Sequence, residues 1–326
     1  MSTRLRSSSA AALIAAVLVL PVRAGEQAAA WPTKPIRIIV SSGAGGGLDF
    51  VARQVATPMS ESLGQSVVVD NRAGASGSIA AELTAQAAPD GYTLMVLSAS
   101  LVVYSVVNKT RYDLFRDFDA ISQIAASPYI LTVHPSLPVQ SVKDLIGYAR
   151  ANPGKLNFAS TGPASLAHLA GELFALTTST KMVHVPYKGV GAAMPDMLSG
   201  RIHLSFLSGG SVYSQVRTQK LKALAIASPV RSKMTPELPT MIEAGVPGFL
   251  VTQWHGLLAP RATPRAIVDR LHAEVVKAVQ RQEVASRLAL DGTEPIASSP
   301  KEFAAHLRAE AQQWSKVAKA ANITAQ

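Results

Sequence analysis

The chain has 326 residues, of which 48% are hydrophobic and 16% are charged, so it can bury a larger core than one compact domain usually has. It contains no cysteine, which excludes disulfides, thiolate metal ligands, thiol nucleophiles and a cysteine-linked lipid anchor. The 31 basic residues exceed the 21 acidic ones, but they are scattered and only 6% of the chain is aromatic, which argues against nucleic-acid binding.

The first thirty residues have the pattern of a secretory signal peptide. Arg4 and Arg6 precede an apolar run over residues 10–20, and small residues follow where a signal peptidase could cut, after Ala24 or Ala30. The apolar run is roughly half as long as the ~20 residues that a membrane-spanning helix needs. We therefore predict a soluble, periplasmic protein that is exported by residues 1–30.

After the signal peptide, short β-rich runs alternate with amphipathic stretches. The runs cover residues 36–40, 66–70 and 92–98, and helices are predicted over residues 48–64 and 77–91. A strand that alternates with a helix in this way is typical of a parallel sheet with helices on both faces. The first part of the chain is therefore predicted to be α/β.

A second series of the same kind follows. Helices are predicted over residues 141–154, with Ser141 as the N-cap, and over residues 165–176. The strands of this series are predicted over residues 129–134, 156–160, 182–187, 202–208 and 221–228.

The C-terminal third is predicted to be helical. Thr263 is the expected N-cap of a helix over residues 263–282, and Ser299 with Glu302 forms a capping box at the start of a second helix over residues 298–321. Both helices need a sheet to cover, and the first lobe offers one. We expect lobe one to contain residues 31–125 and 252–326, and lobe two to contain residues 126–251.

Several kinds of enzyme site are not supported. The stretch after the first strand has Gly43 and Gly45 but Leu48 where a dinucleotide fingerprint needs a third glycine. The glycine-flanked Ser76 does not complete the nucleophile motif of hydrolases, and the seven histidines show no metal-ligand spacing. We expect no catalytic residue, no metal and no cofactor.

Serine-rich and glycine-rich turns follow four of the predicted strands. Such turns collect at the carboxyl edge of a parallel sheet, where the free N–H groups of the next helix favour an anion. They cover residues 41–47, 71–78, 98–100 and 160–165. A binding cleft for a small anion is predicted at this edge.

Six motifs, in one register from Trp31 to the end, resemble the Bug family, the substrate-binding proteins of tripartite tricarboxylate transporters. The motifs are WPTKPIRIIVSSGAGGGLDFVAR, VVVDNRAGASGSIAAE, APDGYTL, NFASTGPASLAHLAGELF, HVPYKGVGAAMPDMLSG and WHGLLAPRATPRAIVDRLHAEVVKAV. The resemblance implies a two-lobed periplasmic-binding-protein type II fold, a Venus flytrap in which each lobe is a mostly parallel sheet flanked by helices. It also implies that a small organic carboxylate is held between the lobes.

The resemblance carries over to two loops, residues 41–49 and residues 160–165. It implies that Asp49 is a helix-start residue first and a ligand contact second, and that His168 orients its neighbours. Two leucines, Leu48 and Leu207, stand where polar residues are common in the family, which favours an aliphatic or aromatic acid over an amino acid. The candidate ligand-binding residues are Ser42, Gly43, Ala44, Gly46, Gly47, Leu48, Asp49, Ser98, Ser100, Ser160, Thr161, Gly162, Ser165 and Leu207.

The sequence leaves two functions open for this fold. The first is a periplasmic receptor that delivers a carboxylate to the large and small membrane subunits of a tripartite tricarboxylate transporter. The second is a carboxylate sensor that acts on a signalling protein. An exported hydrolase or dehydrogenase is a distant third. We expect a monomer that binds no nucleic acid.

Overall fold

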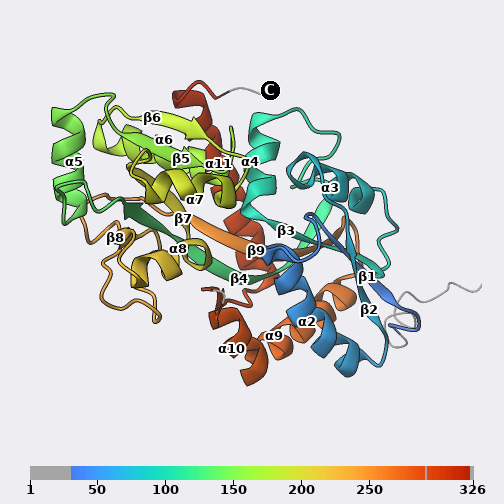
Figure 1. The fold of residues 1–326 in the computed structure, drawn as a ribbon. Helices are drawn as coiled ribbons and strands as arrows, with labels where there is room; N and C mark the ends of the chain where they lie inside the picture. The colour runs from blue at the N-terminus through green and yellow to red at the C-terminus, as the bar shows by residue number, and fades with distance from the viewer. Residues whose placement is uncertain (1–30, 291, 324–326) are drawn as a thin grey trace, which may run out of the picture. The chain divides into compact units, whose positions relative to one another are not determined.

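The computed structural model describes residues 31–290 and 292–323, so the predicted signal peptide lies outside the described residues. Figure 1 shows strands and helices alternating along most of this part of the chain. None of its helices is both long and apolar enough to cross a membrane, residues 1–30, 291 and 324–326 not being considered.

The first series forms a parallel sheet, as predicted. Strand β1 pairs in parallel with β2 on one side and with β3 on the other. The elements are β1 (Ile36–Val40), α2 (Gly47–Leu63), β2 (Val67–Asn71), the short 3-10 helix η1 (Ala75–Gly77), α3 (Ser78–Ala85), β3 (Thr93–Ser98) and α4 (Ala99–Val107). Helix α4 had not been predicted.

The second series contains another parallel group, in which β5 pairs with both β6 and β7. The elements are β4 (Phe118–Val133), α5 (Val142–Ala151), β5 (Asn157–Ser160), α6 (Leu166–Thr178), β6 (Val183–Pro186), α7 (Val190–Leu198), β7 (Leu204–Ser208), α8 (Gly209–Arg217) and β8 (Lys222–Ile226). Ser141 caps α5 as predicted, because its side chain accepts a hydrogen bond from the backbone N–H of Asp144.

Two antiparallel strands join the parallel groups, so the sheet is mixed. Strand β9 (Thr252–Pro260) lies between β3 and β4 and is antiparallel to both. The first part of β4 pairs with β9, and its last part pairs with β7 and β8. The strand order is β2-β1-β3-β9-β4-β7-β5-β6, which places β4 and β9 between the two parallel groups (Figure 1).

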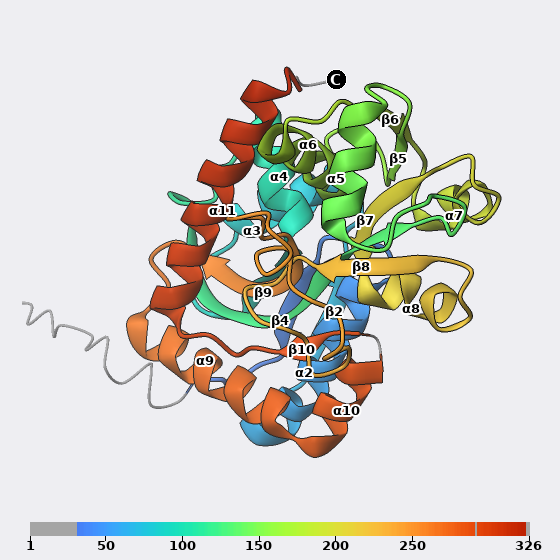
Figure 2. The same ribbon diagram turned by 90° about the vertical axis from the view of Figure 1, so that its left-hand side faces the viewer.

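The C-terminal helices pack on helices of the first series and on β4. Helix α9 (Arg265–Gln280) packs against α2 and β4, and α11 (Pro300–Ala320) packs against α4 and β4 (Figure 2). Helix α10 (Gln282–Leu290) lies beside α9, and β10 (Glu294–Pro295) pairs with β4. Each helix buries one apolar face, which contains Ile267, Leu271, Val275 and Val279 in α9 and Phe303, Leu307 and Trp314 in α11.

The predicted N-terminal cap is confirmed for α11 and is wrong for α9. The predicted capping box is confirmed, since Ser299 and Glu302 exchange side-chain to backbone hydrogen bonds at the start of α11. The predicted cap of α9 is wrong. Pro264 occupies the N-cap position, and the Thr263 hydroxyl donates to the carbonyl of Pro260 at 2.7 Å, so the threonine side chain is held in the preceding turn.

Candidate functional site

A cavity of about 570 Å³ lies where the loops that follow several strands meet the faces of β4 and β9. Its lining is dominated by hydroxyl groups and glycine backbone. The lining residues are Ser41, Ser42, Gly46, Gly47, Leu48, Ser76, Ser98, Ser100, Ser127, Ser208, Gly210, Ser211, Gln253, His255 and Thr293. Among these described residues no side chain is an acid, a lysine or an arginine, so a bound ion would meet no formal countercharge in the wall.

The N-termini of three helices meet at this cavity. The N-cap residues are Gly46 for α2, Ser98 for α4 and Ser208 for α8, and all three line the cavity. In none of the three does a side chain accept a hydrogen bond from the first turn of the helix. The first-turn N–H groups of each helix therefore have no side-chain cap, and the partial positive charge of three helix ends favours an anion.

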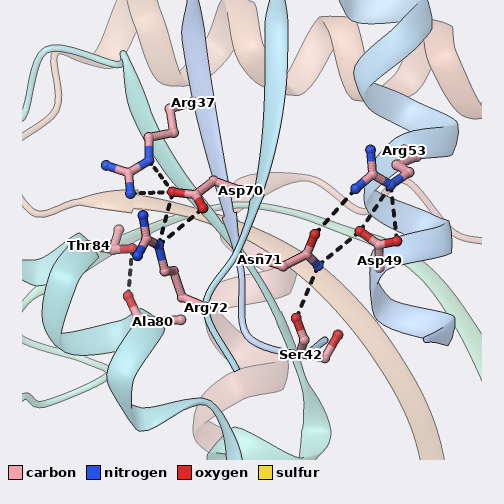
Figure 3. Close-up of polar contacts among 9 residues, drawn as sticks. All are labelled: Arg37, Ser42, Asp49, Arg53, Asp70, Asn71, Arg72, Ala80 and Thr84. Carbon is pink, nitrogen blue, oxygen red and sulfur yellow. Dashed lines mark hydrogen bonds and ion pairs between the residues drawn. The ribbon is translucent and has the colours of Figure 1, made fainter. Parts of the chain in front are cut away.

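The glycine loop before α2 is held by a network around Asp49 (Figure 3). The Asp49 side chain is 5% exposed and accepts hydrogen bonds from the backbone N–H of Gly45 and from the Arg53 guanidinium. The amide of Asn71 donates both to Asp49 Oδ1 and to the carbonyl of Ser42, each at 3.0 Å. These bonds tie the loop to β2 and α2, so Asp49 positions the cavity wall without lining the cavity.

The same network stabilises the ionised form of Asp49. Burial opposes ionisation, but the hydrogen bonds from Arg53, Gly45 and Asn71 outweigh it and hold the pKa of Asp49 below its ordinary value. The carboxylate is therefore charged at neutral pH, and it forms an ion pair with the Arg53 guanidinium.

Asp70, near the end of β2, is paired with two arginines. It accepts hydrogen bonds from Arg37 and Arg72, as Figure 3 shows. Burial opposes ionisation here too, and these two arginines lower the pKa of Asp70. The Asp70 carboxylate therefore forms salt bridges with both arginines at β2, the edge strand of the sheet.

Six of the fourteen predicted ligand-binding residues line the cavity. They are Ser42, Gly46, Gly47, Leu48, Ser98 and Ser100. Gly43 and Ala44 lie in the same loop, outside the lining, and Asp49 is turned into the network described above. Leu207 is 3% exposed and packs in the hydrophobic core, so the structure gives Leu207 no cavity surface.

The loop after β5 satisfies its own polar groups. The Ser160 hydroxyl lies 2.6 Å from His184 Nε2 and accepts from the backbone N–H of Gly162. The His184 ring stacks on His168 with ring centroids 3.7 Å apart, and burial together with His168 lowers the pKa of His184 to about 4. His168 Nδ1 accepts from the backbone N–H of Ala164, so this histidine orders the loop, as the sequence suggested.

Ser165 caps α6, which is why this helix end differs from the three at the cavity. Its hydroxyl accepts from the backbone N–H of His168, whereas the Ser98 hydroxyl caps nothing in α4. The predicted site residues Ser160, Thr161, Gly162 and Ser165 all lie outside the cavity lining.

Replacement of Ser165 by alanine is expected to lower the free energy of unfolding by ~1 kcal/mol, because an N-cap hydrogen bond is lost. Ser98 occupies the same helix position but makes no side-chain cap hydrogen bond. Ser98→Ala should therefore lower the free energy of unfolding much less. Urea denaturation of the two variants beside the unmodified protein measures the difference. Equal losses would show that Ser165 has no special capping role.

Sequence reasoning missed nine of the lining residues. They are Ser41, Ser76, Ser127, Ser208, Gly210, Ser211, Gln253, His255 and Thr293. A signal existed for five of these. Ser41 and Ser76 lie in turns that were predicted to form the cleft, and Ser208-Gly209-Gly210-Ser211 repeats the pattern of a strand followed by a serine and glycine turn. Ser127, Gln253 and His255 lie inside strands β4 and β9, where the turn pattern gives no signal.

A larger groove of about 1210 Å³ lies between α8, β8 and α10. It is lined by the C-terminal half of α8, by residues that include Leu221 and Leu238, and by Leu290, which is 88% exposed. No helix N-cap lines this groove among the described residues, so it lacks the backbone donors that distinguish the smaller cavity.

Comparison with known proteins identifies the family. The model for the tripartite tricarboxylate transporter family receptor, TctC, matches residues 51–323. The chain is 38% identical to a protein encoded in the tcbD-tcbE intergenic region of Pseudomonas sp. (strain P51), over 88% of this chain and 86% of that protein. It is 36% identical to BugT of Bordetella pertussis, over 88% and 89% of the two chains.

A solved structure agrees with this relationship. The structure of R. palustris Rpa4515 with adipate is 36% identical and superposes with a TM-score of 0.76, over 90% of this chain and 99% of that one. The periplasmic binding protein BugD is 30% identical and superposes with a TM-score of 0.73, over 91% of this chain and 100% of that one. Such relatives confirm the predicted α/β fold of the two-lobed type II periplasmic-binding-protein class, and with the family match they confirm the resemblance stated from the motifs. The chain belongs to the tripartite tricarboxylate transporter receptor, or Bug, family, whose members are solute-binding proteins and not enzymes.

Proposed function

We propose that this protein is a periplasmic solute-binding protein that captures a small organic carboxylate in the 570 Å³ cavity and delivers it to a membrane transporter. The observation that carries the proposal is the meeting of three uncapped helix N-termini at one cavity. A carboxylate needs several hydrogen-bond donors and a favourable potential, and both are supplied by the backbone at these helix ends.

The chemistry of the lining favours a carboxylate over a phosphate and over an amino acid. The loop has no lysine of the kind that binds phosphate in a P-loop, and Asp49 beside it disfavours a phosphate, which concentrates up to two negative charges on one group. An amino acid would bury its ammonium group among described lining residues that offer no carboxylate, which costs several kcal/mol. The relative Rpa4515, whose structure contains adipate, supports the same class of ligand.

The proposed lobes are residues 31–125 with 252–326, and residues 126–251. In this arrangement β4 and β9 carry the chain between the lobes, and the cavity draws on both, with α2 and α4 from lobe one and α8 from lobe two. The packing of α9 on α2 supports the return of the chain to lobe one. A hinge at β4 and β9 would let the lobes close on the ligand.

The proposed partners are the large and small membrane subunits of a tripartite tricarboxylate transporter, which fits the family of receptors to which the chain belongs. A sensor that acts on a signalling protein would use the same cavity. Deletion of the gene separates the two functions, because loss of a transport receptor abolishes uptake of the ligand, whereas loss of a sensor changes expression and leaves basal uptake intact.

Thermal unfolding of the mature protein with a panel of organic acids tests the binding proposal. A ligand present at a hundredfold excess over its Kd stabilises the folded state by about 2.7 kcal/mol, so a true ligand should raise the unfolding temperature clearly. We expect at least one mono- or dicarboxylate to do so, and amino acids and inorganic phosphate to have no effect. No stabilisation by any carboxylate would contradict the proposed function.

A further inference from the structure

Gly292, which follows α10, packs against the first turn of α8 with no space for a side chain. A Cβ added to Gly292 would lie 2.8 Å from the backbone nitrogen of Gly210 and 3.3 Å from the carbonyl carbon of Gly209. A packed interior does not hold a carbon at 2.8 Å from a backbone atom unless one of the two segments shifts. Two stretches that are far apart in the sequence therefore meet backbone to backbone, and the contact requires a glycine.

The ring of Tyr213 lies across both sides of this contact. Its Cε2 atom would be 2.3 Å from a Cβ at Gly209 and 3.1 Å from a Cβ at Gly292. Gly292 is buried and has φ +69°, a left-handed backbone conformation that favours glycine. The absence of a side chain at residue 292 is therefore needed for two separate reasons, the backbone conformation and the close packing.

The contact lies at the edge of the cavity and joins the two proposed lobes. Gly210 in α8 and Thr293, the residue after Gly292, both line the cavity. A hydrogen bond lies beside the contact, because the Ser232 hydroxyl donates to Glu294 Oε1 at 2.7 Å. In the proposed division α8 and Ser232 belong to lobe two, whereas Thr293 and Glu294 belong to lobe one. Both the packing and the hydrogen bond therefore cross from one lobe to the other.

Both sides of the contact are anchored on one stretch of β4. Glu294 in β10 pairs with Ala126, and Ser208, the N-cap of α8, pairs with Tyr129. In the proposed arrangement the chain passes from lobe one to lobe two along this stretch of β4. A displacement close to a hinge produces a larger displacement at the rims of the lobes. A side chain wedged into the contact would therefore hold the cavity open.

The contact also decides where the N-terminus of α8 lies. The Gly210 N–H belongs to the first turn of α8, where no side chain accepts a hydrogen bond at the cap. It is one of the backbone donors that a carboxylate held by α2 and α4 could reach across the cavity. The donor and acceptor atoms of such a bond lie about 2.7–3.2 Å apart, so a modest widening between the lobes would take α8 out of reach.

We infer that Gly292 is a positioning residue, whose missing side chain lets the lobes close far enough for the N-terminus of α8 to reach a carboxylate bound at α2 and α4. Gly292 is not among the residues that line the cavity, and it acts through α8. This inference rests on the proposed function and on its division into lobes. It assigns the close packing of Gly292 to ligand binding, whereas φ +69° alone would be a matter of local turn geometry.

The test compares Gly292→Ala with a matched control, Gly248→Ala. Gly248 has φ +71° in an exposed turn, and a Cβ there would meet nothing within 4 Å. Both variants place an alanine in the left-handed region and carry the same backbone strain. Only Gly292→Ala adds a clash between the lobes, so a larger effect of this variant on ligand binding reports the contact with α8.

Calorimetric titration with adipate, the acid in the structure of the relative Rpa4515, measures the loss of affinity. Gly292→Ala should bind adipate at least about tenfold more weakly than the unmodified protein, because the α8 donors no longer reach the carboxylate. Gly248→Ala should bind it within about twofold of the unmodified protein. At saturating adipate, small-angle X-ray scattering should give a larger radius of gyration for Gly292→Ala than for the other two proteins, since its lobes cannot close fully.

Ser232→Ala tests the same contact without any backbone strain, and it decides the matter if Gly292→Ala does not fold. It removes the hydrogen bond from Ser232 to Glu294 and should weaken adipate binding about threefold. With Gly292→Ala unfolded, an unchanged affinity of Ser232→Ala would overturn the inference.

The outcomes separate the inference from the proposed function. If adipate does not bind the unmodified protein, the same comparison uses the acid that raises the unfolding temperature most. If no carboxylate raises it, the proposed function fails and the inference fails with it. Equal affinities of Gly292→Ala and Gly248→Ala overturn the inference alone. Full compaction of Gly292→Ala at saturating acid also overturns it, because it would show that the lobes close with a side chain at residue 292.

Discussion

Gly46→Glu is expected to abolish carboxylate binding while the protein still folds cooperatively. Gly46 is the N-cap of α2 and lines the cavity, and its backbone, at φ −79° and ψ 165°, is open to any residue. A Cβ there would meet its nearest neighbour, the carbonyl oxygen of Gly43, at 3.5 Å, which is ordinary contact. Fold and stability should therefore be preserved.

The loss of binding has an electrostatic reason. A second carboxylate within about 5 Å of the ligand repels it by ~3 kcal/mol at an effective dielectric constant of 20, which corresponds to more than a hundredfold in Kd. Titration calorimetry with the best acid from the thermal screen measures this. Unchanged affinity would show that the loop after β1 is a turn and does not bind the ligand.

Two control variants isolate the cause. Gly46→Gln has nearly the same size without the charge, so it should bind at least about tenfold more tightly than Gly46→Glu if repulsion dominates. Gly147→Glu adds the same charge on the exposed face of α5, where a Cβ would meet nothing within 4 Å. It should bind like the unmodified protein.

Asp49→Ala is expected to have the second large effect, on both stability and affinity. The substitution removes the acceptor for Gly45 N–H and Asn71, and it leaves the Arg53 guanidinium without its carboxylate. Hydrogen bonds to a buried charged group are worth about 1.5–3 kcal/mol, so the free energy of unfolding should fall by ~2–3 kcal/mol. The loosened loop should also bind the acid roughly tenfold more weakly.

Asp269→Ala is a matched control, because Asp269 forms an ion pair with Arg265 that has the same four-residue spacing but is largely exposed. Exposed pairs of this kind contribute at most ~1 kcal/mol. Urea denaturation should therefore separate the two variants by at least about 1 kcal/mol. Equal losses would contradict the role given to the Asp49 network.

The Asp49 contribution should depend on pH with a definite sign. The pKa of Asp49 in the folded protein lies below its ordinary value of 3.8, so the carboxylate stabilises the fold fully above that value and loses this contribution as the pH falls below it. The difference in unfolding free energy between the unmodified protein and Asp49→Asn should shrink below about pH 4. A difference that grows on acidification would exclude the assignment.

Local structure was largely predictable because its signals lie close together in the sequence. The strand over residues 36–40 was predicted with its observed bounds, and Ser141, Ser299 and Glu302 cap their helices as expected. Helix α4 was missed because its valine-rich sequence directly follows β3 and has no capping side chain, so the local pattern resembles a continued strand.

The cavity was predictable where it is built from turns and not where it is built from strands. Ser42 and Gly46 follow the end of β1, and Ser98 is the last residue of β3, which the sequence shows. His255 becomes a cavity residue only through its pairing with Ser98, more than 150 residues away, and no local pattern carries that register. Leu207 was placed in the site by analogy, and the register of β7 with β4 buries it instead.

The most direct test of the account is a crystal structure of the protein with the tightest-binding acid from the thermal screen. We predict a carboxylate of that acid within hydrogen-bond distance of backbone N–H groups in the first turn of α2 or α4, in the cavity that Gly46 and Ser98 line. An acid bound instead in the groove beside Leu290, or at the Ser160–Ser165 loop with the helix ends untouched, would contradict the account.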